Sequence, residues 1–183
     1  MAQVCLVGKE ELNLRYELLS RETARDALVA YDLGEPFSNA VAVDTVSLGA
    51  AVALLNDLDW YLVRFVAHAL VYEQSVSESE WLSRDLATAI RDDEVDPADT
   101  GRFLKMFGVV ESEADDGDGA SDSEDPADEA AGHADDTGGH TAGPPRLVEP
   151  MLVTRTGETI PEYDLREVND TLIVRVTESE FGA

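Results

Sequence analysis

A strongly acidic segment divides this chain and limits how the rest of it can fold. Between Glu111 and Gly143 there are 12 Asp or Glu residues, no Lys or Arg, and almost no large apolar side chain. Such a composition cannot bury enough surface to offset the entropy lost on ordering, so residues 111–143 are predicted to be a disordered acidic loop or linker. The segment that follows is too short to fold alone. We therefore expect residues 1–110 and 144–183 to form one domain around this insertion.

Hydrophobic periodicity on both sides of the insertion predicts an α+β domain. Alternating or continuous apolar runs indicate strands, and apolar side chains three and four residues apart indicate helices. The predicted strands are 4–7, 12–18, 40–46, 60–72, 147–154 and 172–177, and the predicted helices are 21–32, 48–58, 78–91 and 97–107. Residues 12–18 also fit a helix through Leu12, Tyr16 and Leu19. The pattern favours a single mixed or antiparallel sheet with helices mainly on one face.

The charge balance favours an environment of high salt. The chain has 39 acidic and 13 basic residues, a net charge of -26, and only two of the basic residues, Lys9 and Lys105, are lysines. Self-repulsion of this size opposes compaction in dilute buffer. Molar salt screens it, because the Debye length then falls to about 3 Å. We interpret the chain as a halophilic protein from a cell that keeps salt inside; the alternative is an ordinary acidic protein with an acidic tail.

The sequence predicts a cytoplasmic location. Its first residues lack the basic and apolar regions of a secretory signal peptide. A continuous apolar run of the roughly 18 residues that a membrane-spanning helix needs is also absent. We expect no association with a membrane.

The search for catalytic motifs identifies no catalytic residue. Glycine-rich nucleotide loops, paired-histidine metal helices and nucleophile elbows are missing. His133 and His140 lie in the acidic segment, where ligands would not be held rigidly enough for a metal site. His68 is interpreted as a structural histidine, with a catalytic base as the alternative, and Cys5 as a small buried apolar side chain. The sequence therefore predicts no metal site and no cofactor.

Arginines near the start of the chain form the one candidate ligand site. Arg21 and Arg25 have the i,i+4 spacing that places two side chains on one helix face. Arg64 interrupts the run 60–72; if that run is a strand, Arg64 shares a face with Leu62 and needs a buried acid or a bound anion. The predicted ligand-binding residues are Arg15, Tyr16, Arg21, Arg25 and Arg64. The alternative is internal ion pairing with acids that suit the guanidinium equally well, namely Glu17, Glu22, Asp26 or Asp44.

Four stretches of the chain resemble an uncharacterised family of haloarchaeal proteins, a domain of unknown function. These stretches are 13–28 (NLRYELLSRETARDAL), 44–65 (DTVSLGAAVALLNDLDWYLVRF), 80–87 (EWLSRDLA) and 171–183 (TLIVRVTESEFGA). The resemblance implies an archaeal, cytoplasmic origin and so agrees with the high-salt interpretation. It implies no activity, cofactor or site residue.

These observations favour a non-catalytic binding or regulatory domain that recognises an anionic small molecule through arginines. The first alternative is an enzyme with an unrecognised active site that acts on a phosphorylated or carboxylated metabolite. The second is a subunit of a larger assembly with a protein partner. A nucleic-acid partner is disfavoured, because such binding depends on Lys and Arg that neutralise phosphates and no basic stripe is present. The sequence does not define an oligomeric state.

Overall fold

The computed structural model describes residues 1–112 and 142–182, and in these ranges seven strands form one mixed sheet in the order β2-β1-β3-β4-β7-β5-β6. The strands are β1 Ala2–Gly8, β2 Ala40–Thr45, β3 Val66–Glu73, β4 Trp81–Ser83, β5 Phe103–Val110, β6 Arg146–Thr154 and β7 Asp170–Arg175. Neighbouring strands are antiparallel except β4 and β7, which are parallel. The predicted α+β class with a single mixed sheet is confirmed.

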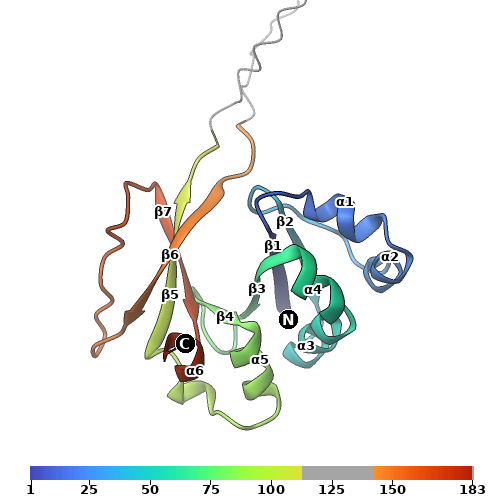
Figure 1. Cartoon of the computed structure of the whole chain (residues 1–183). Coiled ribbons are helices and arrows are strands. Elements are labelled where there is room, and N and C mark those ends of the chain that lie inside the picture. The colour runs from blue at the N-terminus through green and yellow to red at the C-terminus, as the bar shows by residue number, and fades with distance from the viewer. Residues whose placement is uncertain (113–141, 183) are drawn as a thin grey trace, which may run out of the picture.

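The segment after residue 142 supplies part of the middle of this sheet (Figure 1). β7 pairs with β4 on one side and with β5 on the other. β5 therefore joins the strands of the first hundred residues only through β7. Sequence on both sides of the acidic segment builds a single hydrogen-bonded sheet. The acidic segment itself, residues 113–141 with His133 and His140, lies outside the described residues.

Helices cover one face of strands β1 to β4. The helices of the described ranges are α1 Leu14–Leu19, α2 Glu22–Leu28, α3 Leu48–Asp57, α4 Asp59–Phe65, α5 Arg84–Arg91 and α6 Glu178–Gly182. Figure 1 shows α1 to α4 gathered beside β1, β2 and β3. Val4 and Leu6 of β1 are buried here against helical side chains such as Leu18 and Leu55. Residues two apart on a strand point to the same face, so this helical layer explains the burial of Val4 and Leu6.

The opposite face of β1 and β3 is covered by the other end of the sheet. Cys5 and Leu70 pack with Phe107 and Val174 in a second buried cluster, so the sheet curls until β5 and β7 face β1 and β3. The Ser38 amide donates a hydrogen bond to the carbonyl of Pro145 at 2.8 Å, which links the segments that precede β2 and β6. Burial raises the pKa of the Cys5 thiol to about 12. The curl leaves a hollow between the two ends of the sheet.

Two predicted strands contain helices. Residues 60–72 were expected to be one strand, yet α4 ends at Phe65 and β3 begins at Val66. Leu58, Leu62 and Phe65 face the core at helical spacing. The residues between them are also mostly apolar, so the helical periodicity could not be recognised in the sequence. Residues 12–18 belong largely to α1, whose amide at Tyr16 is capped by the Asn13 side chain. The helical alternative was correct, but the helix buries Leu14 and Leu18 instead of the expected Leu12, Tyr16 and Leu19.

Two predicted helices contain strands, and a third is shorter than expected. Residues 97–107 form a 3-10 turn, Pro97–Asp99, and then β5, in which buried Leu104 and Met106 alternate with Lys105. Residues 81–83 form β4, so the helix expected over 78–91 begins only at Arg84. The helix expected over 21–32 spans Glu22–Leu28. Residues 81–83 and 103–110 form strands rather than helices because each pairs with two neighbouring strands of the sheet.

Candidate functional site

The arginines predicted from sequence do not form one pocket. Arg15 and Tyr16 lie on α1, Arg21 is the N-cap residue of α2, and Arg25 lies in the last turn of α2. Arg64 is exposed near the end of α4 rather than on a strand face with Leu62, so the expected need for a buried acid was wrong. The structure brings only two of the five together, because the guanidinium carbons of Arg21 and Arg64 lie 5.8 and 4.1 Å from the centroid of the Trp60 ring.

The ion-pairing alternative holds for one of these arginines. Arg21 pairs with Glu17 at 3.3 Å. Within residues 1–112 and 142–182, Arg15, Arg25 and Arg64 have no carboxylate oxygen within 4.0 Å.

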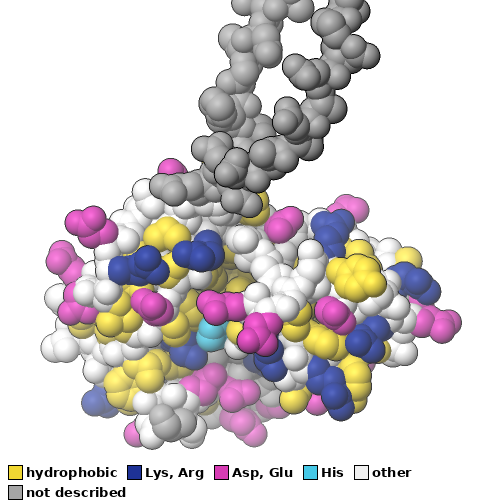
Figure 2. All heavy atoms as spheres, turned by 45° about the horizontal axis from the view of Figure 1, so that its top comes forward, with side chains coloured by type: hydrophobic (Ala, Val, Ile, Leu, Met, Phe, Trp, Pro, Cys, Tyr) yellow, Lys and Arg dark blue, Asp and Glu magenta, His cyan; other side chains and the backbone are white. Residues whose placement is uncertain are grey.

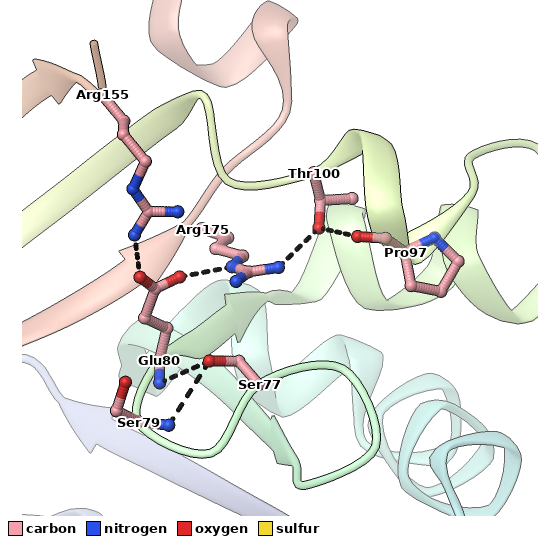
Figure 3. A network of polar contacts seen from close by, with 7 residues as sticks. All are labelled: Ser77, Ser79, Glu80, Pro97, Thr100, Arg155 and Arg175. Atoms are coloured by element: carbon pink, nitrogen blue, oxygen red, sulfur yellow. Dashed lines mark hydrogen bonds and ion pairs between the residues drawn. The ribbon is translucent and has the colours of Figure 1, made fainter. Parts of the chain in front are cut away.

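A largely buried polar network lies beside the start of β4, with arginines at the C-terminal ends of β6 and β7 (Figure 3). Glu80, which immediately precedes β4, accepts hydrogen bonds from Arg155 and Arg175. Arg175 also donates to the hydroxyl of Thr100 at 3.0 Å. Burial lowers the pKa of the Arg155 and Arg175 guanidinium groups, and the positive charge of Arg175 adds to the effect at Arg155. Among the described residues no buried polar side-chain atom lacks a partner. We therefore interpret this network as structural, because it holds the start of β4 to the ends of β6 and β7.

A hollow inside the curled sheet is the best candidate for a ligand site. Its volume is about 400 Å³, which falls within the range typical of small-molecule pockets. Val7 of β1, Phe107 of β5, and Leu147 and Val148 of β6 supply apolar walls, and His68 of β3 lies at its floor. The polar rim consists of Glu10, Arg146, Glu149 and Arg166. We call this feature the His68 hollow; Figure 2 shows the histidine recessed among acidic and basic side chains.

His68 is held in its neutral form. Burial lowers the pKa of the imidazole to about 4, and the positive charge of Lys105 contributes to the same direction. The ring packs edge-on against Phe107, with the two centroids 4.8 Å apart. A neutral imidazole has one N–H donor and one acceptor nitrogen, so at pH 7 it can hydrogen-bond a ligand without adding charge.

A smaller cavity of about 150 Å³ lies on the other side of His68. It shares Ala67 and His68 with the first hollow and is lined by Ser83, Lys105 and Glu180. The Ser83 hydroxyl donates to Glu180 at 2.6 Å, while its oxygen accepts from the Leu86 amide and caps α5. Ser83 is thus committed to holding α5 and α6, and it is not a free nucleophile.

The arginines of the His68 hollow form no ion pair with another described residue. In the described part of the chain, neither Arg146 nor Arg166 has a carboxylate oxygen within 4.0 Å, although Glu10 and Glu149 line the same hollow. Sequence analysis singled out His68 but missed both arginines. They follow the acidic segment, far along the chain from His68, and only the curl of the sheet brings them close. The run Pro144-Pro145-Arg146 is the one local signal, since it marks where the chain re-enters the fold.

Two classes of feature are missing from residues 1–112 and 142–182. No three His, Cys, Asp or Glu side chains there are placed to hold a metal ion. None of the helices in these ranges combines the length and apolar character that crossing a membrane requires.

Comparison with known proteins identifies a family for this α+β chain. The model of a family of unknown function, DUF5804, matches residues 2–109. That match covers more than half of the chain, and the chain belongs to this family. No curated protein and no solved structure matches it. The match ends inside β5, so Arg146 and Arg166 lie outside it.

Proposed function

We propose that this chain is a non-catalytic binding domain that holds a small organic anion in the His68 hollow. The observation that carries the proposal is the pairing of apolar walls with two arginines, Arg146 and Arg166, that have no internal carboxylate partner within the described ranges. A guanidinium presents a planar fork of donors that fits a carboxylate or a phosphate. The hollow thus replaces the arginine cluster predicted from sequence as the anion site.

The walls restrict the kind of anion. Val7 and Leu147, which are only partly buried in the free protein, would stay in contact with water if the hollow held only an inorganic ion. An apolar body on the ligand would bury them, and burial of apolar surface contributes roughly 25 cal/mol per Å². Glu10 and Glu149 on the rim would repel a second negative group. These contacts favour a ligand with one anionic group and an apolar body, such as a carboxylated or phosphorylated metabolite.

Binding without catalysis is supported by the surroundings of His68. A histidine that acts as a general base is oriented by an acid and lies within hydrogen-bond reach of a nucleophile. Among the described residues, the ring of His68 packs against Phe107, and the Ser83 and Glu180 side chains that line the smaller cavity beside it are hydrogen-bonded to each other. The imidazole is therefore suited to accept or donate one hydrogen bond to a bound anion.

The proposal is tested by thermal shift and calorimetry with benzoate, phenyl phosphate and inorganic phosphate in about 2 M KCl, where surface repulsion is screened. We expect the two aromatic anions to raise the melting temperature more than inorganic phosphate does. Arg166→Gln should abolish most of that stabilisation. Arg25→Gln, which removes an arginine outside the hollow, should preserve it. Equal responses of the two variants, or no response of the parent to any anion, would refute the proposal.

The same chain is proposed to work at high salt, in the cytoplasm of a halophilic archaeon. The net charge of -26, the presence of only two lysines and the resemblance to haloarchaeal sequences support this. Screening at molar salt also leaves short-range contacts to decide which anion binds.

A further inference from the structure

A second surface, distinct from the His68 hollow, is built around the exposed ring of Trp60. Helix α4 buries Leu62 and turns Trp60, Val63 and Arg64 outward, with Trp60 50% and Val63 69% exposed. We call these three residues, together with Lys9 and Arg21, the Trp60 surface. Figure 2 shows basic and hydrophobic side chains, with acidic ones between them, on the right of the molecule, where Figure 1 places α1, α2 and α4.

Three cationic side chains converge on this one helix. The guanidinium of Arg64 lies 4.1 Å from the centroid of the Trp60 ring, and that of Arg21 lies 4.9 Å from the centroid of Phe65. The ammonium group of Lys9 donates to the backbone carbonyl of Val63 at 3.0 Å. Stacking and hydrogen bonding hold these long side chains in place, so a partner would lose less side-chain entropy in binding them.

The three basic side chains of the Trp60 surface are opposite in sign to the net charge of the chain. In the parts of the chain that the structure describes, Lys9 and Arg64 have no carboxylate oxygen within 4.0 Å, and only Arg21 is paired, with Glu17. A locally positive surface on a protein of net charge -26 attracts an acidic partner there and repels it elsewhere. An acidic partner would therefore bind at the Trp60 surface rather than elsewhere on the protein.

We infer that the Trp60 surface docks an acidic segment of a partner protein that carries at least one apolar side chain between its carboxylates. The carboxylates would meet Lys9, Arg21 and Arg64, and the apolar side chain would cover Trp60 and Val63. Trp and Arg are the residue types that dominate binding energy at protein interfaces. A nucleic acid fits less well, because its long run of phosphates would extend beyond three cations onto an acidic exterior.

The experiment uses the full chain and a fluorescein-labelled peptide of alternating Asp and Leu residues, at the lowest KCl concentration that keeps the protein folded by circular dichroism. Binding is followed by fluorescence anisotropy. We expect the peptide to bind, and Arg64→Gln and Trp60→Ala each to weaken it by about tenfold, the equivalent of 1.4 kcal/mol. Arg91→Gln on α5, outside the surface, should leave the affinity unchanged.

Three comparisons make the inference refutable. A peptide with Asn in place of Asp should bind at least about tenfold more weakly, and an oligothymidylate of matching length should bind more weakly than the acidic peptide. Arg166→Gln, in the His68 hollow, should not alter peptide binding, so failure here is distinguishable from failure of the anion proposal. Absence of peptide binding, equal binding by Arg64→Gln and Arg91→Gln, or tighter binding of the oligothymidylate would overturn it.

Discussion

Glu80 is the most buried acidic side chain in the described part of the molecule. It is 7% exposed and receives both Arg155 and Arg175, which come from the segment after residue 142. In a chain with 39 acidic residues nothing in the sequence sets Glu80 apart. Its role depends on the backbone that buries it, and the carboxylate links β4 to the C-terminal strands.

Replacement of Glu80 by glutamine should destabilise the fold. The change leaves two partly buried guanidinium groups without a counter-charge, and breaking a buried ion pair costs up to about 3–5 kcal/mol. Because Arg155 and Arg175 retain some contact with water, we expect a loss of about 2–3 kcal/mol. Urea unfolding at fixed KCl measures it, with the exposed Glu158→Gln as the matched control. Equal midpoints for the two variants would contradict the structural role of Glu80.

His68 should make stability depend on pH. Its pKa of about 4 in the folded protein lies below the ordinary value of 6.5, so the unfolded chain binds a proton in this range before the folded one does. The free energy of unfolding therefore falls as pH decreases from 6.5 toward 4, and His68 accounts for about 2 kcal/mol of the fall between pH 7 and pH 5. We expect His68→Gln to have a flatter profile by that amount in urea unfolding. Parallel profiles would show that the imidazole titrates normally.

At the residue scale, sequence reasoning did not identify the candidate site, because it interpreted His68 as a structural histidine and named other arginines as ligand-binding residues. His68 was recognised as the one histidine outside the acidic segment. Arg146 and Arg166 were missed because their proximity to His68 depends on a sheet that curls over strands far apart in sequence. Arg64 was selected because it was assumed to lie on the buried face of a strand. It lies instead on helix α4, where it is exposed.

Among the elements, local signals were sufficient for α3 and insufficient for strands whose pairing with distant segments decides the structure. Ser47 caps α3 by accepting from the Ala50 amide, and the predicted helix 48–58 is confirmed. The strands predicted at 40–46 and 147–154 are also confirmed. β4 and β5 were predicted as helices, because their strand character comes from neighbours such as β7 that a local reading does not include.

The buried and exposed faces of α4 can be tested by two substitutions, one on each face. Leu62 is 5% exposed and Val63 is 69% exposed. We expect Leu62→Ala to cost about 2–4 kcal/mol, because it removes buried methyl groups and leaves a cavity. Val63→Ala should change stability by less than about 0.5 kcal/mol. Urea unfolding of both variants measures this, and a large loss for Val63→Ala would show that this segment does not present the faces described for α4.

The whole molecule combines a well-packed core with a net charge of -26. We expect the urea midpoint to rise as KCl increases from about 0.1 M to about 2 M, because the Debye length falls from roughly 10 Å to below 3 Å and screens the self-repulsion. Sucrose, which stabilises folded proteins without screening charge, should give a smaller rise at matched water activity. A circular dichroism spectrum and midpoint that stay constant across this salt range would remove the case for a high-salt habitat.

The position of β7 between β4 and β5 imposes an order on biosynthesis. When β5 emerges from the ribosome, the strand that will join it to the earlier part of the sheet is still some sixty residues from being made. The edges of the sheet that β7 will join remain unpaired in the nascent chain until β7 has been made. Premature termination between β5 and β7 would then release a polypeptide with exposed edges, a substrate for chaperones and proteases rather than a smaller working protein.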